Sequence, residues 1–299
     1  MNLYAGIELG GTKTVVGLAS GDGRLVERST HPTRDPYETL SHVADALNRL
    51  ADYHGPISGI GIGAFGPVHV NPASPDYGRL GRTPKLAWVD FDLIGFFSER
   101  FAVPIALDTD VSAAAHGEVR WGAARDAKSV VYITIGTGVG AGILIDGQSV
   151  HGVLHPEVGH IRVPRAEDDE YPGGCPHHGD CLEGMAAGPS VIARWGKPLN
   201  ELHSNHEAWH CVSHYLGHLV SNVILFVAPE RIVLGGGVMS STALYPLVRG
   251  KVQGLLNGYV SVPEVLDSLD TLVVPPGLGS DAGVLGSAAL VMPGTNAGA

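Results

Sequence analysis

Residues 6–19 read GIELGGTKTVVGLA, and this stretch decides the fold that we expect. Apolar residues alternate on either side of a glycine-rich turn, as in two antiparallel strands joined into a β-hairpin. Residues 132–145, YITIGTGVGAGILI, repeat this arrangement further along the chain. Two similar hairpins indicate an internal duplication, so the sequence predicts two related domains that each open with a hairpin.

Helical segments follow both hairpins. Amphipathic or small-residue patterns predict helices over residues 37–53, 111–122, 206–228 and 281–292. Because strands alternate with helices, the expected fold class is α/β. We expect a small N-terminal domain over residues 1–118, a large C-terminal domain over residues 119–280, and a terminal helix, 281–293, that packs back on the first domain.

The composition is typical of a globular protein that does not bind nucleic acid. Hydrophobic residues make up 44% of the 299 residues and charged residues 16%, which suffices for a packed core. The formal net charge is −11 without any lysine or arginine cluster, whereas a phosphate backbone requires a basic surface. No apolar run approaches the roughly 20 residues of a membrane helix, and the N-terminus lacks a signal-peptide pattern. We therefore expect a cytoplasmic protein with no membrane partner.

The two hairpin turns are candidate phosphate sites. Glycine lets backbone N–H groups approach an anion without a Cβ in the way, and a nearby hydroxyl or lysine adds donors. A matched pair of such turns can hold a polyphosphate, whereas either turn alone reads more readily as an ordinary tight turn. The residues concerned are Gly10, Gly11, Thr12, Lys13, Gly136, Thr137 and Gly138.

Two further stretches are rich in glycine. Residues 61–66, GIGAFG, match the spacing of a dinucleotide-binding loop, but Pro67 follows where that loop needs a helix. We interpret them as the end of a strand under close backbone contact. Residues 233–239, VLGGGVM, read as a buried strand that runs into three glycines. This pattern suits either a ligand held against the backbone or a plain strand-to-helix turn.

Asp108 and Asp110, within LDTDVSAAAHGE over residues 107–118, are candidates for a general base. They lie two residues apart at a strand end, so their side chains are expected on the same side, just before a predicted helix. Aspartate is also a common helix-capping residue, which is the alternative interpretation. The spacing alone does not choose between the two carboxylates.

Residues 175–181, CPHHGDC, combine two of the chain's three cysteines with two histidines. In a reducing compartment, clustered cysteines bind metal more often than they form disulfides. A redox pair, in turn, favours the C-x-x-C spacing. The third cysteine, Cys211, is expected to be a free buried thiol.

The ligand spacing favours zinc. Cys175, His178 and Cys181 are evenly spaced, and His160 upstream completes four nitrogen and sulfur ligands, the set of a closed tetrahedral zinc site. We predict one structural Zn²⁺ on these four residues, with His177 as the competing ligand.

Other polar side chains lie near this cluster or on a later helix. HPEVGH (155–160) and CLEG (181–184) bring carboxylates and an imidazole close to it, as partners for sugar hydroxyls or as support for the metal site. In the predicted helix over 206–228, histidines recur at every fourth position. This pattern favours a partly buried surface or subunit contact over a metal site. These histidines are His206, His210, His214 and His218.

Taken together, these segments resemble the ROK family of sugar kinases, within the actin, sugar-kinase and Hsp70 superfamily. The resemblance covers most of the chain and rests on GIELGGTK, DTDVSAAAHGE, TIGTGVGAGI, HPEVGH, CPHHGDCLEG, IVLGGGVM and LGSDAGVLGSAAL. Residues 65–88, above all TPKLAW, and Glu8 in place of an aspartate are similar to bacterial fructokinases. The resemblance implies a two-lobed, actin-like (ribonuclease H-like) ATPase fold, with duplicated domains and a cleft between them.

The resemblance also implies roles for the candidate residues. It marks Asp110 as the base in transfer of the γ-phosphate of ATP, with Mg²⁺, to D-fructose, giving fructose 6-phosphate. It implies that the sugar contacts Gly66, Pro67, Thr109, Glu157, His160 and Glu183. It implies that the nucleotide lies against the two glycine turns, Pro189, Gly235, Gly236, Gly237 and Val238. It agrees with the zinc ligands, since relatives commonly carry an aromatic residue at position 177, and it implies a homodimer.

Other functions remain open on the sequence. Thr109 and Ser112 stand where many relatives carry asparagine, so mannose, glucose or an amino sugar are alternative acceptors. A transcriptional repressor would carry an N-terminal DNA-binding domain, for which a hairpin starting at Gly6 leaves no room. A sugar-binding regulatory protein is disfavoured because Asp110 and both phosphate turns are present.

Overall fold

The computed structural model describes residues 2–294. The chain splits into two compact units. The division differs from the boundary expected at residue 118 in two ways: the first stretch of the first unit runs on to Lys128, and strand β7 (Val139–Ile145) begins in the second unit and ends in the first. The first unit comprises Met1–Lys128, Gly142–Pro156 and Gly277–Ala299, and the second comprises Ser129–Ala141 and Glu157–Pro276.

The first unit is built on a mixed sheet with the strand order β3-β2-β1-β4-β5. The β1–β2 and β2–β3 pairs are antiparallel, whereas the β1–β4 and β4–β5 pairs are parallel. Its elements are β1 (Leu3–Leu9), β2 (Lys13–Ser20), β3 (Leu25–Pro32), α1 (Pro36–His54), β4 (Ile57–Ala64), α2 (Leu93–Ser98), β5 (Ile105–Thr109), α3 (Asp110–Trp121), β8 (Gln148–Ser149) and α10 (Ala282–Ala289), with 3-10 turns at Leu86–Trp88 and Gly279–Asp281.

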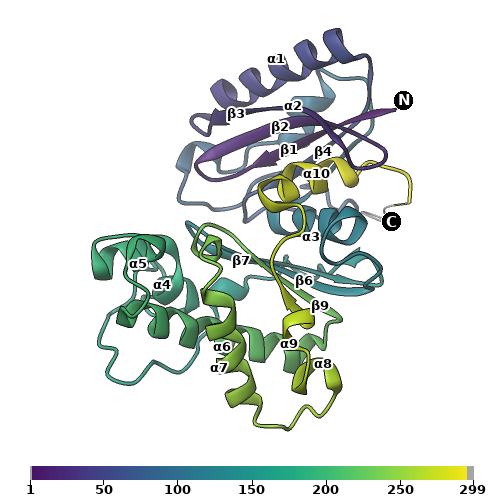
Figure 1. Cartoon of the computed structure of the whole chain (residues 1–299). Helices are drawn as coiled ribbons and strands as arrows, with labels where there is room; N and C mark the ends of the chain where they lie inside the picture. The colour runs from purple at the N-terminus through teal and green to yellow at the C-terminus, as the bar shows by residue number, and fades with distance from the viewer. Residues whose placement is uncertain (1, 295–299) are drawn as a thin grey trace. The chain divides into compact units, whose positions relative to one another are not determined.

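Helices α1 and α10 lie on opposite faces of the sheet of the first unit (Figure 1). Ile7 and its odd-numbered neighbours pack into the core that contains Leu40 and Leu47 of α1. Tyr4, on the opposite face, packs in a cluster with Leu285 of α10. The period of two along the strand therefore places α1 on one face of the sheet and α10 on the other.

A second mixed sheet has the order β10-β9-β6-β7-β8. The β6–β9 and β9–β10 pairs are parallel, and β7 pairs antiparallel with β8. Residues 136–138 join β6 to its neighbour β7, so both predicted strand–turn–strand segments are present. The other elements of the second unit are β6 (Ser129–Ile135), α4 (Leu182–Ala186), α5 (Gly188–Trp195), α6 (Glu207–Val227), β9 (Arg231–Gly235), α7 (Leu244–Leu256), α8 (Pro263–Leu266), α9 (Leu269–Leu272) and β10 (Val273–Val274), with 3-10 turns at Val158–His160, Leu199–Glu201 and Val238–Ser240.

The four predicted helices correspond to α1, α3, α6 and α10. One boundary was assigned to the wrong residue: α3 begins at Asp110, and Thr109 caps it by accepting a hydrogen bond from the Ser112 N–H. The capping role that was the alternative interpretation for aspartate therefore belongs to the threonine before it.

Helix α6 is the core helix of the second unit and packs on α7 and α4. Within residues 2–294, α6 is the one helix whose length and apolar composition would permit a membrane crossing, so the expectation that no apolar run approaches that length was too strict. More than half of its apolar stretch is buried inside the protein, as in a core helix. Three histidines of the predicted stripe make contacts within the chain: His206 caps α6, His214 donates a hydrogen bond to the Pro164 carbonyl, and the His218 ring packs edge-on against that of His214.

We predict that Gly61→Ala destabilises the protein. A Cβ on Gly61 would lie 1.7 Å from the Ser287 carbonyl oxygen, so α10 has to move away from the sheet. The free energy of unfolding in urea should fall by about 3 kcal/mol, at the upper end of ordinary overpacking. The control is Gly254→Ala in α7, where no atom lies within 4 Å of the new Cβ. It should leave stability unchanged or slightly raised, and equal losses in both variants would contradict the close contact.

Candidate functional site

The two candidate carboxylates of the first unit have different surroundings. Asp108 is 4% exposed, and its carboxylate accepts hydrogen bonds from the Thr109 N–H at 2.7 Å and from the Ser149 hydroxyl at 2.7 Å. His151 Nε2 lies 3.1 Å from the same carboxylate. Burial raises the pKa of Asp108, but the His151 contact and the Ser149 hydrogen bond outweigh it and the pKa is lowered. The oxygens of the Asp108 carboxylate are therefore already engaged by groups of the protein itself.

Asp110 is the first residue of α3 and is half-buried. Its Oδ1 accepts the N–H of Val111 at 2.9 Å. The Thr109 hydroxyl, which also donates to the Ser112 hydroxyl at 2.9 Å, fixes the turn from which Asp110 projects. Of the two carboxylates that the sequence left undecided, Asp110 is the one whose exposure permits contact with a substrate.

The first glycine turn is braced by threonines. The Gly10 N–H donates to the Lys13 carbonyl at 3.0 Å, which closes the turn between β1 and β2. The Thr33 hydroxyl donates to the Gly10 carbonyl at 2.8 Å, and the Thr33 N–H donates to the Thr12 carbonyl at 2.9 Å. The turn itself is exposed at Gly11, Thr12 and Lys13, so its donors are available to a ligand.

Lys85 lies beside this turn and was not among the predicted site residues. Its Cε is 3.9 Å from the position that a Cβ on Gly11 would take. Lys85 belongs to TPKLAW, whose Trp88 is buried and donates from Nε1 to the Arg34 carbonyl at 2.7 Å. The signal in the sequence was the TPKLAW segment, but only the packing of Trp88 brings its lysine to the glycine turn.

In the second unit, the predicted nucleotide residues lie together. The Gly136 N–H donates to the Gly138 carbonyl at 2.9 Å, and the Gly188 N–H donates to the Gly136 carbonyl at 2.8 Å. Pro189 follows directly in the first turn of α5. A Cβ on Gly188 would lie 3.9 Å from Cγ2 of Val238.

The glycine run at the end of β9, Gly235 to Gly237, lies beside the turn between β6 and β7. A Cβ on Gly136 would lie 4.0 Å from the Gly237 nitrogen. Gly236 has φ 90°, and a Cβ there would lie 2.4 Å from the Ile135 carbonyl oxygen, so only glycine fits. Thr137 is exposed at the tip of the β6–β7 turn, and Gly235 ends β9.

Glu183 and Glu157 come from two short elements of the second unit. Glu183 lies in α4, and its Oε2 accepts the Val139 N–H at 3.0 Å, which holds one carboxylate oxygen at the start of β7. Glu157 precedes the 3-10 turn Val158–His160. In the first unit, Gly66 and Pro67 follow the end of β4, joined by a cis peptide bond.

The four predicted metal ligands form a group. The ligand atoms of His160, Cys175, His178 and Cys181 all lie within 4.8 Å of one another. Nδ1 of His160 is 3.8 Å from the Cys175 sulfur and 3.5 Å from the Cys181 sulfur, and Nδ1 of His178 is 3.6 Å from the Cys175 sulfur. The three cysteines of the chain are free thiols. His177 is exposed and outside this group.

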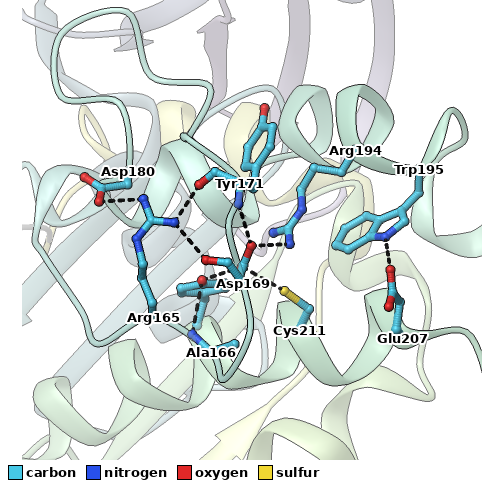
Figure 2. Close-up of polar contacts among 10 residues, drawn as sticks. Arg165, Ala166, Asp169, Tyr171, Asp180, Arg194, Trp195, Glu207 and Cys211 are labelled. Atoms are coloured by element: carbon cyan, nitrogen blue, oxygen red, sulfur yellow. Dashed lines mark hydrogen bonds and ion pairs between the residues drawn. The ribbon is translucent and has the colours of Figure 1, made fainter.

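The loop between His160 and Cys181 is anchored by a second polar cluster, which the sequence analysis missed (Figure 2). Asp169 accepts hydrogen bonds from Arg194 at 2.7 Å, from the Tyr215 hydroxyl at 2.6 Å and from the Cys211 thiol at 3.3 Å. Asp169 stands in the run EDDE, which reads as a solvated charged stretch. Cys211 is half-buried rather than fully buried, and burial raises its pKa to about 11.

The chain is similar to known proteins over nearly its whole length. Residues 4–293 match the ROK family. The chain is 39% identical to a putative fructokinase of Bacillus subtilis, covering 96% of this chain and 95% of that one, and 40% identical to a fructokinase of Pediococcus pentosaceus, covering 95% and 96%. The fold is similar to a ROK hexokinase of Thermus thermophilus, with a TM-score of 0.74, 25% identity and coverage of 96% and 97%. It is also similar to a ROK glucokinase of Streptomyces griseus crystallised with glucose and AMPPNP, with a TM-score of 0.73, 24% identity and coverage of 97% and 99%.

We predict that Asp169→Ala destabilises the second unit. The Arg194 and Asp169 side chains are 10% and 3% exposed, so removing the carboxylate leaves a buried guanidinium without its partner. The free energy of unfolding should fall by about 3–5 kcal/mol, while Glu170→Ala, an exposed neighbour, should change it by less than about 0.5 kcal/mol.

The same contacts give a pH dependence. Burial raises the pKa of Asp169, but hydrogen bonds from Tyr215 and from the Tyr171 N–H outweigh it and lower the pKa overall. A lowered carboxyl pKa contributes stability above the ordinary aspartate pKa that is lost as the pH falls through the lowered one. The stability difference between wild type and Asp169→Asn should therefore shrink in acid. A difference that grows on acidification would contradict these contacts.

Proposed function

The chain belongs to the ROK family, and from that premise we propose that it is a fructokinase. It transfers the γ-phosphate of ATP, bound as its Mg²⁺ complex, to D-fructose and releases fructose 6-phosphate. The observation that carries this proposal is the near full-length similarity, at 36–40% identity, to proteins named fructokinase in several bacteria. The TPKLAW segment, with Lys85 beside the first glycine turn, supports the same assignment.

Asp110 is the proposed general base. A sugar hydroxyl attacks the γ-phosphorus in line, and the Asp110 carboxylate accepts its proton, which contributes about 10²- to 10⁴-fold to the rate. The neighbouring Asp108 is unsuited to this role because its oxygens already accept protein donors. The proposed sugar contacts are Gly66, Pro67, Thr109, Glu157, His160 and Glu183.

The phosphates are proposed to bind at the glycine turns. In the first unit, exposed Thr12 and Lys13 and the nearby Lys85 supply a hydroxyl and two cations for the charge that moves during transfer. In the second unit, the turns around Gly136 and Gly237 leave backbone open to the nucleotide, since a Cβ on Gly237 would meet no atom within 4 Å and one on Gly136 would meet only the Gly237 nitrogen, at 4.0 Å.

A zinc ion is proposed for the Cys/His group. Zinc bonds to sulfur and nitrogen of about 2.3 and 2.0 Å imply ligand atoms about 3.5 Å apart on the edge of a tetrahedron. The sulfur-to-nitrogen distances of 3.5, 3.6 and 3.8 Å within the group fit that edge. When bound, zinc supplies structural order to the loop rather than chemistry. His160 points Nδ1 at the sulfurs, which leaves its Nε2 for the sugar.

The protein is further proposed to act in the cytoplasm as a homodimer without nucleic-acid or membrane partners. The net charge of −11 disfavours binding to phosphate backbones. At the end of α6, Leu225 and Phe226 are 54% and 87% exposed, which favours a subunit contact there. Light scattering measures the assembly directly.

The activity is tested by coupled ADP release across a panel of fructose, mannose, glucose and an amino sugar. Fructose should give the highest kcat/KM, with phosphate on the 6-hydroxyl identified by NMR of the product. A higher kcat/KM for glucose would assign a different acceptor. No ADP release with any hexose would refute the kinase assignment.

We predict that Asp110→Asn lowers kcat by about 10²-fold or more, because the amide cannot accept the hydroxyl proton. The KM for ATP should change little, since Asp110 is proposed to act on the sugar hydroxyl and is not among the proposed nucleotide residues. Asp45→Asn on the exposed face of α1 is the control and should behave as wild type. Near-normal turnover of Asp110→Asn would rule out the base.

We predict about one zinc ion per chain in protein purified without tags or chelators. His178→Ala should lose the metal, because a closed site then has three ligands. His177→Ala is the matched control one residue away, and it should retain the metal because His177 lies outside the ligand group. The measurement is metal analysis by mass spectrometry. The opposite pattern would make His177 the ligand in place of His178, and a metal-free wild type would exclude the zinc site.

A further inference from the structure

A buried polar cluster is built around Asp108, two residues before the proposed base in the chain. It joins Asp108 at the end of β5, His116 in α3, Ser149 in β8 and His151 in the loop that follows. All four residues belong to the first unit. His116 is 5% exposed and the His151 side chain 21% exposed, so the cluster is largely removed from water.

The donors in this cluster converge on one carboxylate. The Ser149 hydroxyl donates to Asp108 Oδ2 at 2.7 Å and is therefore left to accept the His116 Nε2–H at 3.0 Å. His151 Nε2 lies 3.1 Å from Asp108 Oδ1, which also accepts the Thr109 N–H. Asp108 thus holds β8 and the following loop to the end of β5.

The surroundings shift the pKa values of the two histidines in opposite directions. Burial lowers the pKa of His151, but the hydrogen bond and ion pair with Asp108 and the Val150 carbonyl raise it overall. For His116, burial lowers the pKa by more than the nearby Asp108 carboxylate raises it, so the pKa is lowered overall. The titratable groups that face His151 are Asp108, from β5, and His116, from α3. A buried carboxylate needs such a partner to stay ionised.

The cluster is connected to both sides of the proposed sugar site. On one side, Asp108 accepts the N–H of Thr109, which caps α3 immediately before Asp110. On the other, the same loop continues to His155, whose Nε2 accepts the Val68 N–H at 3.3 Å, next to Pro67. A displacement of this loop therefore moves the base and the sugar segment together.

We propose that His151 is a positioning residue for Asp110. By holding the buried Asp108 carboxylate, the His151 imidazole fixes the end of β5 and the start of α3, and with them the direction in which the Asp110 carboxylate points. The inference rests on the proposed role of Asp110 as the base. His151 itself does not touch the reacting atoms in this scheme.

The kinetic test compares His151→Leu with His151→Gln, using the hexose that wild type prefers. Leucine removes the hydrogen bond, so kcat should fall about 10-fold or more, while the KM for ATP stays near the wild-type value. Glutamine can still donate to Asp108 and should recover most of kcat. His42→Gln on the exposed face of α1 is the control. Equal kcat values for wild type and His151→Leu would overturn the proposal, as would a His151→Gln variant no better than leucine.

A second test does not depend on any sugar acceptor, so it separates this proposal from the assigned function. In ¹⁵N-histidine NMR titrations, His151 should titrate above the ordinary histidine value of 6.5, and Asp108→Asn should lower that pKa. A raised imidazole pKa contributes stability below the unfolded-state value that is lost as the pH rises through the folded-state value. The difference in Tm between wild type and His151→Gln should accordingly be largest near pH 6 and vanish in alkali. Titration of His151 unaffected by Asp108→Asn would overturn the ion pair.

Discussion

Backbone-to-backbone contact between the first sheet and helix α10 is the constraint on which the first unit depends. A Cβ on Gly6 would lie 1.9 Å from the Val284 carbonyl oxygen, and one on Gly61 would lie 1.7 Å from that of Ser287. On the other side of α10, a Cβ on Gly286 would lie 1.8 Å from the Ala113 carbonyl oxygen in α3. Because α3 starts at Asp110, the glycines that seat α10 also set where the proposed base lies.

Buried charges are stabilised in the same way in both units. Asp108 and Asp169 stand far apart in the sequence, yet each carboxylate accepts several donors and pairs with one basic side chain, His151 or Arg194. In a medium of low dielectric, such a network holds its members in one arrangement, because a group that leaves it is buried without a partner. Each network therefore anchors a loop. The Asp108 network holds the loop that leads to His155, and the Asp169 network holds the loop that leads to the proposed zinc ligand Cys175.

Much of the fold and of the candidate site follows from local patterns. The two glycine turns and the approximate bounds of α1, α3, α6 and α10 are predicted by the sequence, and the structure confirms these elements. The family resemblance is confirmed by the match of residues 4–293 to the ROK family. The domain boundary at residue 118 differs from the division found, because β7 crosses from one unit to the other. Residues 142–156 belong to the first unit through contacts with distant segments, such as Gly142 with Val111 and Ser149 with Asp108, and these contacts leave no local mark at residue 118.

Local sequence alone indicated which residues can turn tightly, which can ligate a metal and, to within a residue or two, where a helix begins, since these properties depend on residues within a few positions of one another. The spacing from Cys175 to Cys181 is of this kind, and so is the glycine run after β9. The tertiary structure was needed to show which aspartate is already engaged by other side chains, because Ser149 and His151 reach Asp108 from about forty residues away. It likewise brought Lys85 to Gly11 and buried Asp169 under Arg194. The physical reason is that burial and hydrogen bonding to distant segments fix the ionisation and accessibility of a side chain, and neither is encoded in its immediate neighbours.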